Sequence, residues 1–314
     1  MKSIYTQAIV LLFMASTTYA AKIDTAVTVS IGGIQQVISM RGKQADQPAL
    51  LYLHGGPGQA ASSQQEKITS QLESSFVVIH WDQRNAGKTL TLNTSPQPAT
   101  LAQMQHDAEE VLDYIRQTLQ QEKVVIVAHS WGNVLGFHLA SKYPGKIAAF
   151  VSVSPGIYPT KSQKIALKRL KKYFRQEHHA QAIAQLDSIK VPHRGLEDMI
   201  IQYRWQHVYE GEEVTDEMLA QYRPFFTDWE KKWMPIYQSL YDQNLLKQIK
   251  EIRCPVYFFV GNRDYTSNYN LTAAYYKRLK APQKEIIWFD TGHNIPHLVP
   301  DLFQQQILKV LDRA

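Results

Sequence analysis

The stretch VVIVAHSWGNVLG, residues 124–136, runs from β-favouring residues through a serine into a segment rich in small residues. The apolar run before Ser130 predicts a buried strand, and the spacing of Gly132, Gly136 and Ala140 predicts a helix with one face close to a sheet. Ser130 is therefore expected in a tight strand-to-helix turn. From this segment alone, Ser130 is either a nucleophile exposed at that turn or a serine that caps the helix.

The residues two before and two after Ser130 decide whether such a turn can form, because the backbone and the neighbouring strands approach closely there. These residues are Ala128 and Gly132, whereas the G-x-S-x-G pattern of a nucleophile turn has glycine at both positions. Alanine adds one methyl group, which we expect a slightly wider turn to accept.

Seven further apolar runs predict strands, and helical patterns separate the later ones. The predicted strands are 26–31, 34–40, 49–54, 76–81, 124–129, 148–154, 256–261 and 285–289. The predicted helices are 101–119, 133–143, 270–279 and 302–311. Continuous apolar strands that alternate with amphipathic helices predict an α/β fold, with a mostly parallel eight-stranded sheet and helices on both of its faces.

Between Pro155 and about Lys250 the alternation stops and no buried strand is evident. We therefore expect an α/β core domain of residues 21–155 and 251–314, with an inserted helical cap domain of residues 156–250.

One predicted cap helix, residues 164–175, places lysines opposite an apolar stripe of Ala166, Leu167, Leu170, Tyr173 and Phe174. Its lysine face is either a solvated surface or a face that associates with an anionic membrane. Aromatic residues elsewhere in the cap either line a pocket or form the core of the cap.

The composition is that of a globular protein with one large core. The 314 residues include 44% hydrophobic and 20% charged residues, and the formal net charge is +6. This modest and dispersed charge argues against a nucleic-acid partner, and no segment has the roughly 18 consecutive apolar residues of a membrane span. The single cysteine, Cys254, can form no intramolecular disulfide and is expected in the core.

The N-terminus has the pattern of an export signal. Lys2 precedes the short apolar segment AIVLLFMA (8–15), and TYA (18–20) ends in the small residue expected before a cleavage site. We expect a signal peptide of residues 1–20, cleaved after Ala20 or Ala21, and a mature protein that is periplasmic or secreted without a stable membrane anchor. The alternative is a first buried strand or helix.

A second motif, LYLHGGPGQ (51–59), follows a predicted buried strand and has three glycines and a proline within five residues. Such a loop has almost no side chains to pack, but it presents backbone N–H groups, as an oxyanion hole requires. Gly56 is the first choice of donor and Gly55 the alternative, and the N–H of Trp131 would be the second donor. The other interpretation is a plain turn.

Three motifs together, HGGPG (54–58), HWDQRNAGKT (80–89) and AHSWGN (128–133), resemble the proline iminopeptidase branch of the α/β-hydrolase fold. The patterns of that family read approximately HGGPG, DQRGxGxS and GxSWGG. The resemblance covers about residues 49–157 and, more loosely, 252–297. This chain departs from the patterns at four positions, which are Asn85, Thr89, Ala128 and Asn133.

In an α/β-hydrolase the nucleophile is followed along the chain by an acid and then by a histidine. Asp264 and His293 each follow one of the last two predicted strands, so both would lie with Ser130 at the carboxyl edge of the sheet. We predict a catalytic triad in which His293 takes the proton of Ser130 and Asp264 orients the imidazole. The local rivals for the acid and the base are Asp290 and His297.

We expect no metal and no cofactor, because the sequence has no H-E-x-x-H motif and the adjacent His178 and His179 cannot easily face one ion. His54 and the DQR triplet are expected to support loops by hydrogen bonds, with Asp82 and Arg84 as a local structural pair.

The resemblance implies a substrate that is a short peptide, cleaved after its N-terminal residue, often proline. Such an activity requires carboxylates in the cap that bind the ammonium group of the substrate. The sequence offers several and singles out no pair among Glu197, Asp198, Glu210, Glu212, Glu213 and Glu230. Two other functions stay open, namely an exported carboxylesterase or lactonase with the same triad, and a catalytically silent binding protein. The sequence does not indicate an oligomeric state.

Overall fold

The computed structural model describes residues 21–60, 62–93, 98–210 and 213–313. The predicted export signal, residues 1–20, lies outside this part of the chain. Within the described ranges, no helix is both long enough and apolar enough to cross a membrane.

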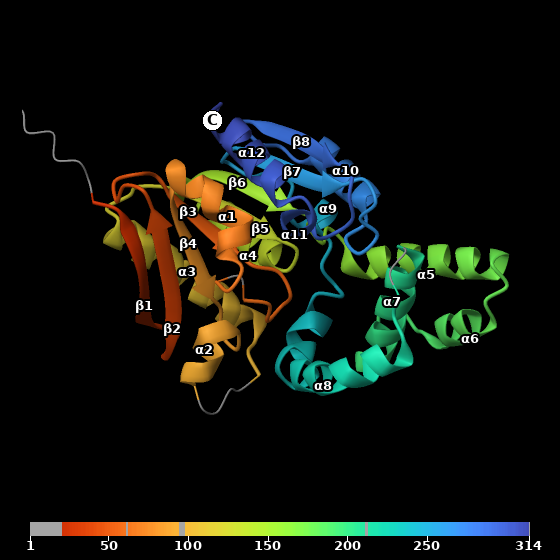
Figure 1. Ribbon diagram of the computed structural model, residues 1–314. Coiled ribbons are helices and arrows are strands. Elements are labelled where there is room, and N and C mark those ends of the chain that lie inside the picture. Colours follow the sequence, from red (N-terminus) through yellow and green to blue (C-terminus); the bar gives the residue numbers. More distant parts are fainter. Residues whose placement is uncertain (1–20, 61, 94–97, 211–212, 314) are drawn as a thin grey trace, which may run out of the picture.

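One eight-stranded sheet forms the centre of the molecule (Figure 1). Its order is β1-β2-β4-β3-β5-β6-β7-β8; β2 pairs antiparallel with β1 and β4, and the other pairings are parallel. The predicted α/β fold with a mostly parallel sheet is confirmed, and every strand lies within a few residues of its predicted place. The strands are β1 (Ile23–Ile31), β2 (Ile34–Gly42), β3 (Ala49–Leu53), β4 (Val77–Asp82), β5 (Val124–His129), β6 (Ile147–Val153), β7 (Val256–Gly261) and β8 (Lys284–Phe289).

The helices divide between the two faces of the sheet and a segment beside it. Helices α3, α4 and α10 pack on one face, and α1, α11 and α12 pack on the other. The helices are α1 (Gln65–Thr69), α2 (Gly87–Leu92), α3 (Leu101–Thr118), α4 (Gly132–Lys142), α5 (Pro159–Gln176), α6 (Ala180–Ser188), α7 (Leu196–Tyr209), α8 (Asp216–Ser239), α9 (Leu245–Gln248), α10 (Tyr269–Arg278), α11 (Ile295–Leu298) and α12 (Pro300–Leu311), with 3₁₀ turns η1 (Ser70–Ser74) and η2 (Pro144–Lys146).

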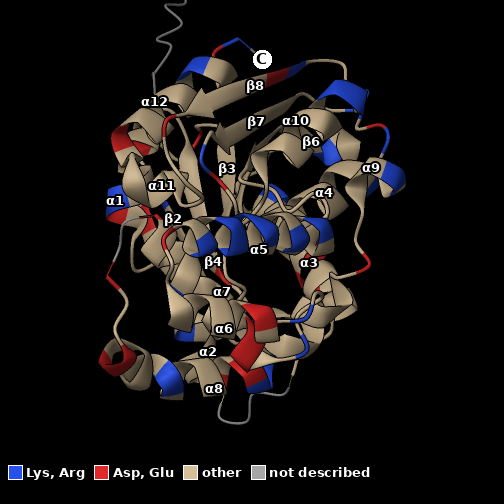
Figure 2. Cartoon of the chain, turned by 90° about the vertical axis from the view of Figure 1, so that its right-hand side faces the viewer, with Lys and Arg blue, Asp and Glu red and all other residues tan. Residues whose placement is uncertain are grey.

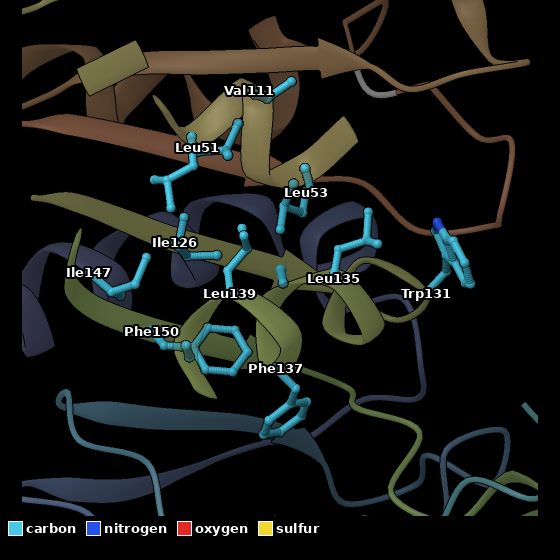
Figure 3. Packing of buried hydrophobic residues seen from close by; sticks show 14 of the residues in the cluster. Leu51, Leu53, Val111, Ile126, Trp131, Leu135, Phe137, Leu139, Ile147 and Phe150 are labelled. Atoms are coloured by element: carbon cyan, nitrogen blue, oxygen red, sulfur yellow. The ribbon is translucent and has the colours of Figure 1, made fainter. Parts of the chain in front are cut away.

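Strand β5 shows why both faces of the sheet are covered. Its side chains alternate in direction, so that Ile126 packs with α3 and α4 while Val125 and Val127 pack with α1 and α12. The cluster around Ile126 joins residues far apart in sequence, such as Leu53 and Val111 (Figure 3). Burial of each such side chain contributes about 1.5–3 kcal/mol, so packing on both faces fixes where β5 ends and the next turn begins.

The parallel strands share one carboxyl edge, and the motifs of the sequence meet there. The HGGPG loop follows β3, Ser130 follows β5, Asp264 follows β7 and His293 follows β8. Residues from four separate parts of the chain are thus brought to one end of the sheet. Cys254 is buried just before β7, as expected.

Helices α5 to α8 lie beside the sheet rather than on either of its faces (Figure 1). The described residues between Pro155 and Lys250 contain no strand. The apolar side of α5 joins α6 and α7 in a small core of its own, and its lysines form a basic band on the outer side (Figure 2). The members of this core are Leu167, Leu170, Phe174, Ala182, Leu186, Ile189 and Trp205.

Helix α8 is the longest helix of this segment, and it contains Pro224 and Pro235. Each proline removes one backbone donor from the helical ladder, and α8 curves instead of running straight (Figure 1). The curve brings the C-terminal half of α8 to the HGGPG loop, which Trp229 and Trp233 contact.

Candidate active site

Ser130 occupies a sharp turn between β5 and α4, and its backbone has a positive φ of 51°. Residues other than glycine seldom adopt this left-handed conformation, which costs of order 1 kcal/mol or more. Two hydrogen bonds attach the turn to the end of β6. The Ser130 N–H donates to Val153 O at 3.0 Å, and Asn133 Nδ2 donates to the same oxygen at 2.8 Å. The Ser130 side chain lines a cavity, so the turn exposes its hydroxyl.

The small residues around Ser130 fit this turn for two separate reasons. A side chain on Gly132 would collide with the carbonyl oxygen of Leu53 on the neighbouring strand. Ala128 is fully buried in β5 and points at Gly136 of α4, where an added Cβ would lie only 3.0 Å from the Ala128 methyl group. The missing side chain at Gly136 therefore leaves the room that the methyl group of Ala128 occupies.

Replacing Gly132 by alanine is expected to destabilise the fold by about 1–3 kcal/mol or more, because the new methyl group meets backbone that cannot rotate away. Thermal unfolding followed by circular dichroism measures this effect. Gly145 is a matched control, since an added Cβ there meets no atom within 4 Å. An unchanged Tm for Gly132→Ala would contradict the close packing of this turn.

The structure joins three of the predicted site residues in one chain of hydrogen bonds. His293 Nε2 lies 2.8 Å from Ser130 Oγ, and His293 Nδ1 lies 2.9 Å from Asp264 Oδ2. Asp264 is fully buried, and its other oxygen accepts the Ser267 N–H at 2.8 Å. A carboxylate at Nδ1 keeps the proton on that nitrogen, so Nε2 can accept a proton from Ser130.

Neither local rival enters this chain of hydrogen bonds. Asp290 is exposed, and its carboxylate accepts a hydrogen bond from Asn262 at 3.1 Å. His297 lies on α11 and faces the ring of His129, with 6.0 Å between the ring centroids. The alternative assignments of the acid and the base are therefore not supported by the geometry.

Two opposing effects act on the pKa of His293. Burial lowers the pKa, but the nearby carboxylates of Asp264, which is hydrogen-bonded to the ring, and of Glu210 raise it more, so the net shift is upward from 6.5. The site thus favours the imidazolium that forms when His293 takes a proton.

Two further side chains that the sequence did not reveal hold the main chain of His293. Ser154 Oγ donates to the His293 carbonyl oxygen at 2.8 Å, and His129 Nε2 lies 3.2 Å from the same oxygen. Burial lowers the pKa of His129 well below its ordinary value, so the ring is neutral near pH 7 and can donate from Nε2. The only signal in the sequence is position, because each residue stands at or just beyond a strand end.

The HGGPG loop brings backbone amides to the nucleophile. Gly56 has a φ of 117°, and a Cβ there would lie 2.7 Å from the Gly58 nitrogen, so only glycine fits. Gly56 and Trp131 line the same cavity as Ser130, whereas Gly55 lies under Ser130, where an added Cβ would lie 3.4 Å from Ser130 Cβ. Trp131 stands at the start of α4, where amide groups lack partners within the helix.

Tryptophan side chains fix this loop to its surroundings. Trp229 Nε1 donates to the Pro57 carbonyl at 2.8 Å, and Trp233 lies against Gly58, where a Cβ would come within 2.5 Å of its indole nitrogen. The Trp131 indole, which projects beyond the end of β5 in Figure 3, packs edge-on against Trp233 at 6.4 Å. The position of the loop thus depends on α8 as well as on the sheet.

The DQR triplet supports the site, but the prediction that Asp82 and Arg84 pair with each other is wrong. Arg84 reaches α3 and pairs with Asp107, at 2.9 Å between Nε and Oδ2, while Asp82 Oδ2 accepts the Lys88 N–H at the start of α2. Strand β4 ends at Asp82, so the alternation that would place both side chains on one face of the strand no longer holds at Arg84. Gln83 accepts a hydrogen bond from Trp131 Nε1 at 2.9 Å and so connects the triplet to the nucleophile turn.

The departures from the family patterns, and His54, have local explanations. Asn85 stands where the pattern has glycine and adopts a φ of 59°, a conformation that asparagine tolerates better than most residues. Thr89 Oγ1 accepts the Val37 N–H at 2.9 Å and so attaches α2 to the sheet. His54 Nδ1 lies 2.8 Å from the Gly55 carbonyl oxygen, which confirms its expected support of the loop.

A cavity of about 820 Å³ contains the hydroxyl of Ser130 and extends under α7 and α8. Its polar lining includes His293, Thr266, Ser267, His207 and Glu213, and the remaining lining from α7 and α8 is mostly apolar. The apolar and aromatic residues from these helices are Leu196, Met199, Ile200, Tyr203, Met218, Leu219, Tyr222, Phe225, Phe226, Trp229 and Tyr237.

The candidate ammonium-binding carboxylates have different surroundings. Glu213 lines the cavity, and Glu210 lies close enough to His293 to raise its pKa. Glu197 pairs with Arg223, Asp198 pairs with Arg194, and Glu230 accepts the Leu196 N–H at 3.1 Å, while Glu212 lies outside the described residues. Glu213 is thus the acid of this set that lines the cavity, and Glu210 is the one whose charge acts on His293.

Among the described residues, no group of three or more His, Cys, Asp or Glu side chains could hold a metal ion. His293 and His297 are spaced as H-x-x-x-H, but His293 is already engaged by Ser130 and Asp264.

Known proteins resemble the chain over most of its length. A family model described as alpha/beta hydrolase fold matches residues 48–298. The probable aminopeptidase YbaC of Bacillus subtilis is 23% identical over 292 residues, which cover 87% of this chain and 92% of that protein. The proline iminopeptidase of Heyndrickxia coagulans is 25% identical over 79% of this chain and 85% of its own length. The crystal structure of a proline iminopeptidase from Mycobacterium smegmatis superposes with a TM-score of 0.64 at 17% identity, covering 92% of this chain and 98% of that one.

Proposed function

The chain belongs to the alpha/beta hydrolase fold family, and from that premise we propose that it is a serine hydrolase with Ser130 as nucleophile. The observation that carries this proposal is the hydrogen-bonded series of Ser130, His293 and Asp264, with distances of 2.8 and 2.9 Å. A strained turn that exposes a serine hydroxyl beside the imidazole of a histidine is the arrangement that activates a weak nucleophile.

In the proposed reaction, Ser130 Oγ attacks the carbonyl carbon of the substrate while His293 Nε2 takes the hydroxyl proton. The negative charge that develops on the carbonyl oxygen is stabilised by the N–H groups of Gly56 and Trp131. His293 then gives its proton to the leaving group as the bond to it breaks, and an acyl group remains on Ser130. A water molecule, deprotonated by His293, attacks this acyl group and restores the free serine.

We propose that the substrates are short peptides, from which the enzyme removes the N-terminal residue as proline iminopeptidases do. Two relatives with aminopeptidase or proline iminopeptidase in their names support this choice, at 23% and 25% identity. Glu210 and Glu213 are the carboxylates proposed to bind the N-terminal ammonium group, because Glu213 lines the cavity and Glu210 acts on the charge of His293.

A carboxylesterase or lactonase is the second candidate, and the mostly apolar lining of the cavity favours it. An ester substrate carries no ammonium group, so its binding would need apolar contacts and no carboxylate. Both candidates use the same Ser130 chemistry and differ in what the cavity recognises.

The comparison of L-prolyl-p-nitroanilide with p-nitrophenyl acetate separates the two candidates. We expect turnover of the anilide, and Glu210→Gln should lower the ratio of anilide to ester kcat/KM by about 10- to 100-fold through loss of a charged hydrogen bond. Glu197→Gln, at an exposed acid paired with Arg223, is the matched control and should leave the ratio unchanged. Turnover of the ester with none of the anilide would reject the aminopeptidase and leave the esterase.

The pH profile follows from the raised pKa of His293. Because His293 must be neutral to accept the Ser130 proton, activity rises with pH through this pKa, and we expect the acid limb of kcat/KM to have its midpoint above 6.5. Glu210→Gln removes one of the charges that raise the pKa and should move the limb to lower pH. A limb that stays in place in this variant would show that Glu210 does not act on His293.

We also propose that residues 156–250 serve as a cap over the site and that residues 1–20 direct export. The cap is supported by α7 and α8, which line the cavity that contains Ser130. The intact mass of the protein recovered from the periplasm or the medium tests the export signal, since cleavage after Ala20 or Ala21 fixes the mass.

A further inference from the structure

Four large hydrophobic side chains at the mouth of the cavity are exposed to solvent. The exposed fractions are 48% for Tyr203, 38% for Met218, 55% for Tyr222 and 63% for Phe225. All four line the cavity that contains Ser130. Three of the four are aromatic, and we call these four residues the aromatic platform.

The residues of the platform are adjacent to one another and form one surface. Met218, Tyr222 and Phe225 follow one another at i, i+4 and i+7 on α8, so they lie on one side of that helix. Phe226 packs between the two helices, with ring centroids 6.1 Å from Tyr203 and 5.7 Å from Phe225. Phe226 therefore joins side chains of α7 and α8 into one contiguous surface.

The exposure of the platform to solvent indicates a binding site. Contiguous apolar patches on a protein surface mark binding sites, because isolated apolar residues are common on surfaces but clustered ones are rare. The other large hydrophobic residues that are exposed in the described ranges, Leu92, Trp288, Leu298 and Leu302, do not line the cavity. The patch thus coincides with the cavity that holds the proposed nucleophile.

The platform and Ser130 line the same cavity, so the ligand of the platform is expected to be part of the substrate. The cavity that contains the hydroxyl of Ser130 and the ring of His293 also contains the four platform residues, which belong to the mostly apolar lining from α7 and α8. The volume of about 820 Å³ is in the upper part of the range for small-molecule sites and far exceeds a single prolyl residue.

We propose that the platform binds an apolar group of the substrate, an aromatic side chain or an alkyl chain, while the scissile carbonyl lies at Ser130. The inference rests on the proposed serine hydrolase chemistry and holds for an ester or an amide bond. It makes the length and apolar character of the substrate a determinant of specificity, in addition to any ammonium group.

A series of p-nitrophenyl esters from acetate through butyrate and hexanoate to octanoate, each below its micellar concentration, tests the platform. We expect kcat/KM to rise about three- to fourfold for each methylene group that reaches it. In the double variant Tyr222→Ser/Phe225→Ser, the octanoate-to-acetate ratio should fall by about 10-fold or more. Leu302→Ser, which removes an exposed residue outside the cavity, should leave the ratio unchanged.

The failure of this inference can be told apart from the failure of the proposed function. If a fluorophosphonate probe labels Ser130 but the wild-type enzyme shows no dependence on chain length, the platform does not bind substrate and the hydrolase stands. If neither labelling nor turnover occurs, the hydrolase itself is rejected. If the double variant keeps the wild-type ratio but loses a dimer or vesicle binding in sedimentation, a second copy or a lipid surface covers the patch and the inference is wrong.

Discussion

Replacing Ser130 by alanine is expected to lower kcat/KM by about 10⁴-fold or more, whichever substrate proves best. The variant loses the oxygen that forms the acyl-enzyme, and no other hydroxyl lies within hydrogen-bond reach of His293 Nε2 in the described structure. The residual rate would come from the oxyanion donors and substrate binding alone.

Steady-state kinetics of the purified variant measure this loss. Ser141→Ala is the matched control, because Ser141 is an exposed serine on α4, the helix that follows Ser130. The control should keep wild-type activity, and both variants should keep the wild-type Tm within a few degrees. A loss below tenfold for Ser130→Ala would contradict its role as nucleophile.

Replacing Asp264 by asparagine is the second large effect, a loss of about 10⁴-fold in kcat. Asparagine can donate its amide N–H to His293 Nδ1, which would place the imidazole proton on Nε2 and leave that nitrogen unable to accept the Ser130 proton. The asparagine oxygen can still accept the Ser267 N–H, so the loop should keep its structure.

A pH profile separates this effect from a structural defect. Since the Asp264 carboxylate raises the pKa of His293, Asp264→Asn should move the acid limb of the remaining activity to lower pH. Asp290→Asn, which changes the exposed acid after β8, serves as the control and should keep both the rate and the limb. The reverse result, a loss in Asp290→Asn and none in Asp264→Asn, would assign the acid to Asp290.

Local pattern was sufficient to predict the elements that carry the candidate site. The apolar run 124–129 and the small residues after Ser130 predict β5, the turn and α4, and the structure has all three. The eight strands were recognisable because each is buried on at least part of its length and bounded by turn residues. Asp264 and His293 could be predicted because parallel strands share one carboxyl edge, so position along the chain fixes position in space.

Partners across long sequence separations could not be predicted in this way. Arg84 pairs with Asp107 on α3, although Asp82 is closer in sequence, because the direction of each side chain depends on where β4 ends. The support of the HGGPG loop by Trp229 joins residues 172 positions apart. Such contacts depend on tertiary packing, which no local pattern records.

The helices beside the sheet were the least predictable part of the chain. The apolar stripe of α5 was evident because one side of that helix meets solvent. Helix α7 packs against other helices on more than one side, since Trp205 and Ile200 belong to two different hydrophobic clusters. Its sequence therefore has no single apolar stripe that predicts an amphipathic helix. The aromatic platform therefore appears only when α7 and α8 are placed together over the cavity.

Labelling with a fluorophosphonate probe, followed by mass mapping of the modified peptide, tests the central claim most directly. The probe reacts with an activated serine and needs no knowledge of the substrate. We predict one adduct, on Ser130, in the wild-type protein and in Ser141→Ala, and none in Ser130→Ala. An unlabelled wild-type protein, or an adduct on another serine, would contradict the assignment of Ser130 as the nucleophile, and the unlabelled result would favour a catalytically silent binding protein.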